Sequence, residues 1–394
     1  MPQKKRILFL LSRFLDGGID TVLLDYLRNL SACDGYQVAL AIGIDMGGLE
    51  VFRGQVPAKV EVIHLVKEGV LTFWRKQKIL GTLPWCAKVA DELFLAPIRR
   101  KIIGSRLRKL SRNYDVMIDF DSCHYSYLGR LPVWKVSWWH FSFEYRMTTD
   151  HHRMQRIGRH LSVYDRVVVI SKAMMDEGQR LFPQMKDKWR LIYNAKDKER
   201  LQCLANETVD DERIQKPYIL AVERLEESQK DLTTLIRAYQ LLKEKHPENH
   251  VRLYLLGKGH DEMRLRTLAV TLGVGEDVVF LGFHDNPYPW IKHARLIAHS
   301  AKMEGLPTAM IESLVLDKLI VSTDCPTGPR EILNNGRSGL LVPVGNVELM
   351  ADAMHKLLTD ETLRTDLLKN ASEHQQRFLF ESTQRQFDEV INKM

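Results

Sequence analysis

The sequence has no run of 18 or more apolar residues, so none of its segments predicts a membrane-spanning helix. Its five cysteines are odd in number and widely scattered, without a CxxC pair. That argues against a disulfide framework and against a structural zinc site, and it favours a reducing, cytoplasmic location. Low-complexity tracts and solenoid-period repeats are also lacking. What is present, 45% hydrophobic and 27% charged residues, is typical of a globular protein.

The net charge of +7 divides unevenly along the chain. Residues 1–200 hold 34 Lys and Arg against 21 Asp and Glu, a balance of +13, which leaves 23 against 29, or −6, for the rest. A basic first half raises nucleic-acid binding as one class of function. No recognisable nucleic-acid module accompanies it, and the acidic second half argues against that class, so we predict no nucleic-acid partner.

Apolar runs of strand length alternate with helix-length segments throughout the chain. In the first half these runs are 6–11, 37–42, 60–66, 115–120, 135–139 and 166–170. In the second half they are 218–223, 251–257, 277–282, 295–300 and 318–323. Runs that are apolar on both faces are typical of parallel strands covered by helices. We therefore predict an α/β protein of two doubly wound, Rossmann-like domains that face each other across a cleft.

The β-α-β pattern occurs twice, and a polar break at residues 196–216 separates the two occurrences. This break predicts an N-terminal domain over residues 1–195 and a C-terminal domain over residues 196–376. Residues 377–394 have a helical pattern, and we expect them to pack back toward the N-terminal domain. Because such sheets bind ligands at the carboxyl ends of their strands, the cleft is the expected site.

The stretch EGLPTAMIE, from Glu304 to Glu312, follows a predicted strand and opens a helix. Gly305 permits a tight turn, and Pro307 suits the first helical turn. The backbone amides after Gly305 are then expected to face an anion. The two carboxylates stand roughly 8 Å apart along the helix, about the span of a diphosphate, so one can bind a sugar and the other a ribose. The alternative is an ordinary strand–turn–helix with two solvated glutamates.

Two further loops follow predicted strands. Arg224 and Lys230 lie six residues apart after the strand at 218–223, a spacing that suits a clamp on a diphosphate but also an ordinary charged turn. Gly17 and Gly18 follow the first strand and open a helix, where their backbone could approach a phosphate or simply make a turn.

Taken together, these stretches resemble the family 4 retaining glycosyltransferases of the GT-B fold. EGLPTAMIE is similar to that family's E-x7-E motif, and AVERLEESQKD to its Gly-Arg-Leu…Lys loop. The segments LYLLGKGHDEMRLRTLAVTLGVGEDVVFLGF, VVVISKAM and LIYNAKD also match, so the likeness covers nearly the whole chain. The sequence departs from the pattern at Glu223, which stands where a glycine is usual, and in an Arg-to-Lys spacing that is one residue longer.

The resemblance implies roles for individual residues. Arg224 and Lys230 would hold the donor diphosphate, Glu312 would bind the ribose, and Glu304 would face the donor sugar. His140, in SWWHFSFE, resembles the family's histidine that faces the sugar; its alternative is an aromatic-flanked core histidine. The remaining positions that the resemblance assigns to donor binding are Gly17, Gly18, Gly305, Leu306, Pro307 and Thr308.

The resemblance also implies an activity. The N-terminal domain would bind the acceptor and the C-terminal domain the nucleotide sugar. Stretches at 322–333 and 336–343 resemble the subgroup that builds bacterial lipopolysaccharide core, O-antigen and oligosaccharides. We therefore expect a hexosyltransferase that moves a sugar, most readily from a UDP-sugar, to a lipid-linked or lipopolysaccharide acceptor. The alternatives are a nucleotide-sugar 2-epimerase of the same fold and a non-catalytic sugar-binding protein.

No cofactor and no required metal are expected beside the nucleotide-sugar substrate. Asp119 and Asp121 could be mistaken for the metal-binding DxD of another glycosyltransferase fold. Because they end a strand of a parallel sheet, without a nucleotide loop beside them, we interpret them as strand-end acids.

Residues 74–112 hold eleven Lys and Arg against two acids, a balance of +9, with aromatic and leucine residues interleaved. That mixture is typical of helices that lie in a lipid headgroup region. We therefore predict a peripheral protein on the anionic cytoplasmic face of a membrane. The alternative is that the apolar residues belong to the core and the cations decorate a solvated helix.

Overall fold

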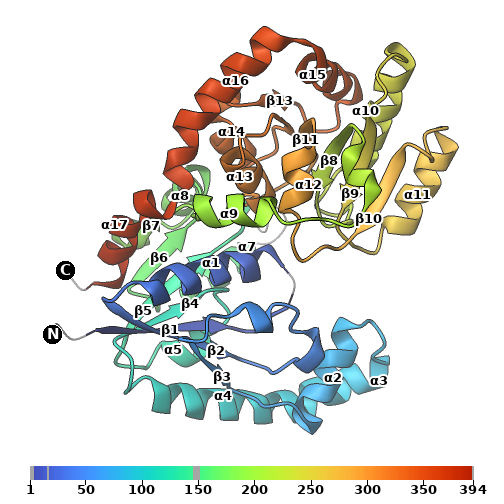
Figure 1. The fold of residues 1–394 in the computed structure, drawn as a ribbon. Helices are drawn as coiled ribbons and strands as arrows, with labels where there is room; N and C mark the ends of the chain where they lie inside the picture. The colour runs from blue at the N-terminus through green and yellow to red at the C-terminus, as the bar shows by residue number, and fades with distance from the viewer. Residues whose placement is uncertain (1–3, 16, 145–150, 393–394) are drawn as a thin grey trace.

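The computed structural model describes residues 4–15, 17–144 and 151–392, the side chains of 151–154 excepted (Figure 1). They form two α/β lobes, each built on a wholly parallel sheet, which confirms the expected fold class. The strand orders are β3-β2-β1-β4-β5-β6-β7 and β10-β9-β8-β11-β12-β13. In both sheets the order reverses next to the first strand, at β1/β4 and at β8/β11, where such folds open a crevice for a ligand.

The N-terminal lobe contains the seven-stranded sheet. Its strands are β1 (Lys5–Leu11), β2 (Tyr36–Ile42), β3 (Glu61–His64), β4 (Val116–Asp119), β5 (Trp134–Trp139), β6 (Arg166–Val169) and β7 (Trp189–Leu191). Its helices are α1 (Gly18–Ala32), α2 (Val70–Ile79), α3 (Trp85–Ala90), α4 (Ala96–Leu110), α5 (Tyr125–Leu128), α7 (His151–Leu161) and α8 (Lys172–Leu181). Helices α1 and α4 lie on opposite faces of the sheet (Figure 1), so its central strands are buried on both sides.

The C-terminal lobe contains the six-stranded sheet. Its strands are β8 (Tyr218–Val222), β9 (Arg252–Leu256), β10 (Val278–Gly282), β11 (Leu296–His299), β12 (Ile320–Thr323) and β13 (Leu340–Val342). Its helices are α10 (Leu232–Lys245), α11 (Glu262–Thr271), α12 (Tyr288–His293), α13 (Thr308–Val315), α14 (Pro329–Ile332), α15 (Val347–Thr359) and α16 (Glu361–His374). Helices α10 and α15 share one hydrophobic core with this sheet, whereas α13 contributes to the core that continues into the N-terminal lobe.

Two features differ from the sequence-based expectation. The edge strands β7 and β13 were not expected, because three residues are too few to give a clear apolar pattern. The polar break at 196–216 contains a helix, α9 (Lys198–Ala205), which packs on α12. Its first turn is capped by Asp197, whose carboxylate accepts from Arg200 N.

The chain returns to the N-terminal lobe at its end. Helix α17 (Phe380–Ile391) lies beside β1 and β5 in Figure 1, below the long helix α16. Phe387 packs on Tyr26 of α1, and the Trp134 indole N–H donates to the Val390 carbonyl at 2.9 Å. The last helix is therefore part of the N-terminal lobe's core, and it ties the two lobes together.

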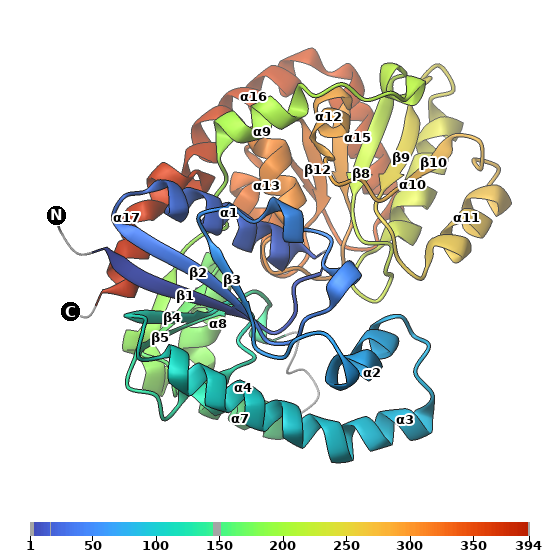
Figure 2. The same ribbon diagram turned by 60° about the horizontal axis from the view of Figure 1, so that its bottom comes forward.

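Helices α2, α3 and α4 form an arm along the outer edge of the N-terminal lobe (Figure 2). Between α3 and α4 a π-helical turn (Asp91–Leu95) interrupts the helix expected over 86–112. None of the helices among the described residues has both the length and the hydropathy to cross a bilayer.

Candidate active site

A cleft of about 870 Å³ lies between the carboxyl ends of the two sheets. Its lining includes residues from the loops after β1, β5, β8 and β11. All the residues proposed for donor binding or catalysis line it: Gly17, Gly18, His140, Arg224, Lys230, Glu304, Gly305, Leu306, Pro307, Thr308 and Glu312. The structure thus brings together positions that lie nearly 300 residues apart in the sequence, and their individual roles are still predictions.

Gly305 lies where the two lobes touch. A Cβ atom at this position would stand 2.1 Å from the carbonyl oxygen of His140, so only glycine fits. Pro307 precedes α13 at the N-cap position, one residue earlier than the first helical turn in which we had expected it. Thr308 begins the helix, and a Cβ on Gly18 would come within 3.6 Å of its hydroxyl. The N-termini of α1 and α13 therefore meet at the cleft, where their amides favour an anion.

Lys230 and Glu304 form a buried ion pair, with 2.5 Å between Nζ and Oε1. Burial alone would lower the pKa of Lys230, but Glu304 and Glu223 reverse that and raise it, so the ammonium stays charged. Arg224 is half-exposed at the rim, 3.7 Å from Glu226. The two expected clamp cations thus face one cleft from a single loop.

Glu312 is held by two side chains that the sequence analysis did not single out. The buried Lys196 ammonium lies 2.7 Å from Glu312 Oε1 and 2.7 Å from Asp25 Oδ2 on α1. Tyr288 donates to Glu312 Oε1 at 3.3 Å. Burial would lower the pKa of Lys196, but the two carboxylates raise it. No local pattern signals this cluster, because Asp25 and Lys196 are 171 residues apart.

His140 is buried at the end of β5, and its Nε2 lies 2.7 Å from the carbonyl oxygen of Phe120. Burial lowers the pKa of His140 to about 4, so the ring is neutral at pH 7. A neutral ring that donates from Nε2 leaves Nδ1 as an acceptor. His140 is therefore both aromatic-flanked and part of the cleft lining, which combines the two alternatives considered from the sequence.

Asp119 and Asp121 have different environments. Asp119 is fully buried and accepts from His124 N at 2.7 Å, from His124 Nδ1 at 2.8 Å and from the Tyr164 hydroxyl. Asp121 accepts from Ser12 N at 2.8 Å and lines the cleft, and its burial raises its pKa. Asp119 is thus committed to internal hydrogen bonds, while Asp121 is a cleft residue that the sequence analysis did not assign to the site.

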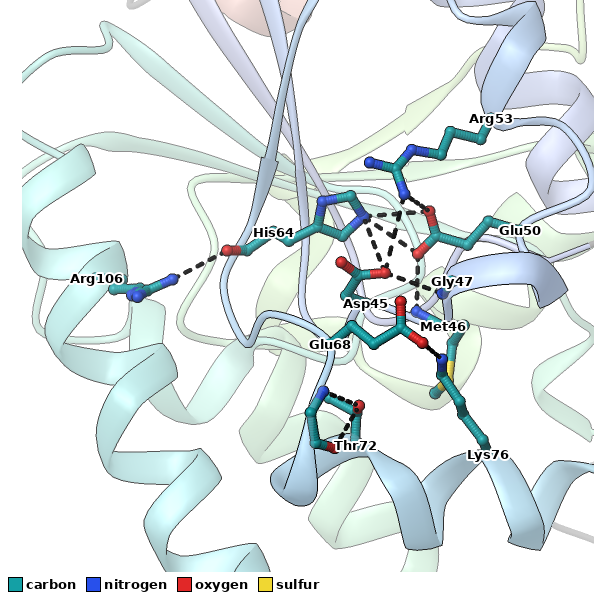
Figure 3. A network of polar contacts seen from close by, with 11 residues as sticks. Asp45, Met46, Gly47, Glu50, Arg53, His64, Glu68, Thr72, Lys76 and Arg106 are labelled. Carbon is teal, nitrogen blue, oxygen red and sulfur yellow. Dashed lines mark hydrogen bonds and ion pairs between the residues drawn. The ribbon is translucent and has the colours of Figure 1, made fainter.

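A second polar cluster lies at the carboxyl ends of β2 and β3 (Figure 3). His64 Nε2 lies 3.1 Å from Glu50 Oε2 and 3.9 Å from Asp45 Oδ1. The carboxylates also accept two backbone N–H groups at 2.9 Å, and the Arg53 guanidinium lies within 4.0 Å of both. Although three of these side chains could offer metal ligands, their contacts fasten the loop after β2 to β3, and we interpret the cluster as structural.

One of the two lobes matches a known protein family. Residues 206–374 match the family model of glycosyl transferases group 1. The C-terminal lobe belongs to that family. The group 1 match begins within the polar break before β8 and ends at α16, so it spans all six strands of the C-terminal sheet.

Among curated proteins, the chain is 32% identical over 200 residues to the N-acetylgalactosamine-N,N'-diacetylbacillosaminyl-diphospho-undecaprenol 4-alpha-N-acetylgalactosaminyltransferase of Campylobacter jejuni, covering 51% of this chain and 52% of that protein. It is 32% identical over 157 residues to the lipopolysaccharide core biosynthesis glycosyltransferase LpsE of Rhizobium meliloti, covering 40% and 44%. The chain thus spans about half the length of these relatives.

Among solved structures, HepE of Anabaena in complex with UDP and glucose superposes with a TM-score of 0.74. The superposition covers 98% of this chain and 99% of that one, at 17% sequence identity. This likeness extends over both lobes and confirms the GT-B architecture.

The depressed pKa of His140 predicts a pH-dependent stability. Between pH 6.5 and about 4 the unfolded chain binds a proton that folded His140 does not, so the free energy of unfolding falls as the pH is lowered. We expect this contribution to be about 2 kcal/mol between pH 7 and pH 5. Urea unfolding of the wild type and His140→Gln at both pH values measures it: the variant should lose less stability. The exposed His260→Gln is the control and should follow the wild type; equal slopes for all three would contradict the assignment.

Proposed function

We propose that this protein is a retaining glycosyltransferase that moves a hexose from a UDP-sugar to a lipid-linked or lipopolysaccharide acceptor in bacterial surface-glycan synthesis. The observation that carries the proposal is the convergence of Arg224, Lys230 and the N-termini of α1 and α13 on one cleft. Two cations and two sets of amides suit a diphosphate. Glu304 and Glu312 stand beside them, where carboxylates can accept from sugar and ribose hydroxyls.

The proposed reaction places the charge of the departing nucleotide against this clamp. The bond between the anomeric carbon and the diphosphate oxygen breaks, and a bond to the acceptor oxygen forms on the same face of the sugar. The acceptor proton passes to the departing phosphate oxygen. Arg224 and Lys230 stabilise the negative charge that develops on that oxygen, and the cleft holds the acceptor hydroxyl beside the departing phosphate on that face. We infer that these cations serve without a required metal or cofactor.

The acceptor is inferred from two kinds of support. The name of the Campylobacter jejuni relative includes a diphospho-undecaprenol, and that of the Rhizobium meliloti relative includes the lipopolysaccharide core. Both are bacterial glycans carried on lipid. An acceptor of this kind at the cytoplasmic face of a membrane would be reached by a peripheral enzyme, and the arm α2–α4 supplies a surface for such docking.

We define the arm surface as the exposed apolar side chains of α2–α4 and the loops that flank them. Its members are Val70, Phe73, Ile79, Leu80, Trp85, Val89, Leu93, Phe94 and Ile98. Trp85 is 78% exposed and Phe94 68%, so these residues do not belong to the core, although Leu83 does. Exposed apolar side chains on helices that also carry many Lys and Arg suit an anionic bilayer surface.

Arg99 differs from the other cations of the arm. It is buried, and its guanidinium forms a bidentate pair with Asp91, with 2.7 Å for each contact. It also donates to the Leu71 carbonyl at 2.8 Å. Arg99 therefore fastens α2 and the π-helical turn to α4 and is not available to lipid, whereas Arg100 and Lys101 are exposed.

The first test of the function is a screen of UDP-, GDP- and ADP-sugars. A UDP-sugar should raise the unfolding temperature, since a ligand at 100 times its Kd adds about 2.7 kcal/mol to the free energy of unfolding.

The rate of transfer to a lipid-linked acceptor should fall about a hundredfold in Lys230→Ala, because the charge on the departing diphosphate loses its partner. Lys216→Ala, on an exposed turn outside the cleft, is the control. Release of UDP and an epimerised sugar from the donor alone would support the 2-epimerase instead, and wild-type turnover in Lys230→Ala would contradict the clamp.

Substitutions of Glu312 and Glu304 should have different effects on nucleotide binding and on turnover. Glu312→Gln keeps the shape of the Lys196 contact but loses its charge, so both UDP and UDP-sugar should bind about tenfold more weakly. Glu304→Gln should lower kcat about a hundredfold and leave the Kd of UDP within about twofold. Titration calorimetry and initial rates measure both effects. The assignment of sugar and ribose is wrong if the two variants weaken UDP binding equally.

Docking of the arm surface predicts cosedimentation with anionic, not neutral, liposomes. Each cation near such a surface contributes about 1 kcal/mol, so Arg100→Glu with Lys101→Glu should weaken binding at least tenfold, as should higher salt. Trp85→Ser with Phe94→Ser should weaken it as well. Lys216→Glu with Lys369→Glu, on exposed positions of the C-terminal lobe, is the matched charge control and should leave binding intact. Binding that ignores lipid charge, or that falls equally in the control, would leave the arm without this role.

A further inference from the structure

A buried carboxylate–imidazole pair lies directly behind the Lys230–Glu304 ion pair. Glu223 follows β8 and His299 ends β11, and these two strands are neighbours in the sheet. Glu223 Oε1 lies 2.7 Å from His299 Nδ1 and also accepts from Ser300 N at 2.9 Å. The exposed fractions of the two side chains are 1% and 3%. Glu223, which stands where the family usually has a glycine, therefore has His299 as its partner.

The other ring nitrogen of His299 points toward the proposed sugar-facing carboxylate. His299 Nε2 lies 3.5 Å from Glu304 Oε1, and no hydrogen-bond partner for it is found among the described residues. The same Glu304 oxygen takes the Lys230 ammonium at 2.5 Å. The four side chains thus form a chain, Glu223–His299–Glu304–Lys230, that leads from the core to the cleft, and His299 itself is among the residues that line the cleft.

The hydrogen bonds of this chain orient the His299 ring. An ionised Glu223 accepts only, so Nδ1 carries the proton of that contact, and Nε2 on the far side of the ring faces the Glu304 carboxylate. Burial would raise the pKa of Glu223, but His299 and Lys230 lower it. Cys325 is a further titratable neighbour of Glu223, Lys230 and Glu304, and burial raises its pKa, so the thiol stays neutral.

Donor binding would change the contacts of Lys230 and Glu304. The Lys230 ammonium cannot make its full contacts with both Glu304 and a diphosphate. The diphosphate carries more charge and is therefore the stronger partner. Among the described residues, the Glu304 side chain would then keep Gln229, whose amide nitrogen lies 3.5 Å from Oε2, and His299. A shift of a few tenths of an ångström brings Nε2 into hydrogen-bond range of Glu304.

We propose that the Glu223–His299 pair is a positioning device, which holds Glu304 against the donor sugar once the diphosphate has drawn Lys230 away. Glu223 orients the ring, and a hydrogen bond between His299 Nε2 and Glu304 Oε1 holds the carboxylate. The proposal rests on the proposed function and adds two positioning residues to it. Neither residue is required to touch the diphosphate. Substitutions at Glu223 or His299 should therefore impair the positioning of the sugar and leave the affinity for the nucleotide unchanged.

The test compares His299→Ala, His299→Gln, Glu223→Gln and the double variant His299→Ala/Glu223→Gln. His299→Ala should lower kcat at saturating donor about tenfold and bring the affinity for UDP-sugar close to that for UDP, with the Kd of UDP changed less than about twofold. His299→Gln retains a donor near the place of Nε2 and should recover part of kcat. The double variant should be no slower than His299→Ala, because Glu223 acts through the ring.

The controls separate this proposal from the proposed function and from misfolding. His374→Ala removes a half-buried histidine outside the cleft that contacts the Glu331 carbonyl, and it should leave both kcat and UDP affinity unchanged. Thermal unfolding identifies variants that fail to fold, and Glu223→Gln, which preserves shape, then carries the test. Wild-type protein that neither binds UDP nor transfers sugar would overturn the proposed function. If the wild type is active, three results would overturn the positioning role alone. These are equal losses of kcat and UDP affinity in His299→Ala, no recovery of kcat in His299→Gln, and additive losses of kcat in the double variant.

Discussion

A single buried ammonium fixes how the two lobes face each other. Lys196 follows the last strand of the N-terminal sheet, and it pairs with Asp25 of one lobe and Glu312 of the other. A buried lysine is stable only while its charge is compensated, so helices α1 and α13 are held at the distance that lets both carboxylates reach it. Since the N-termini of these helices border the cleft, the ion cluster also sets the width of the proposed phosphate site.

Other contacts between the lobes act in the same direction. Glu331 of α14 accepts from Lys172 N at the start of α8, at 2.8 and 2.9 Å, and from the Tyr193 hydroxyl at 2.5 Å. Helix α17 completes the core of the N-terminal lobe with side chains that come from the far end of the chain. The close approach of Gly305 to His140 leaves little room for the lobes to come nearer without a change at the cleft. The two Rossmann-like units are therefore a single structure around one site.

The charged residues of the arm α2–α4 and those of the cleft lie in environments that agree with the roles proposed for each. Excess cations of the N-terminal lobe gather on the arm α2–α4, away from the cleft, next to apolar side chains that stay exposed. The buried cations at the cleft, by contrast, are paired with carboxylates: Lys230 of the lining with Glu304, and Lys196 with the lining residue Glu312. Surface cations can attract an anionic bilayer at long range, whereas buried pairs respond only to a ligand that enters and exchanges partners.

The sequence by itself determined several of the residues that reach the cleft. Stretches such as RLEESQK and EGLPTAMIE are local: a strand of a parallel sheet that runs into a loop and a helix must place that loop at the carboxyl edge, whatever the rest of the fold does. Only the tertiary structure decided how those residues are partnered. Asp25 and Lys196, or Glu223 and His299, carry no signal of their pairing because contact between distant segments depends on strand order and lobe packing. Burial is decided in the same way: Arg99 and Arg100 are adjacent and alike in sequence, yet one is enclosed by Asp91 and the other is exposed, because a helix turns about 100° per residue and only one side faces its neighbours.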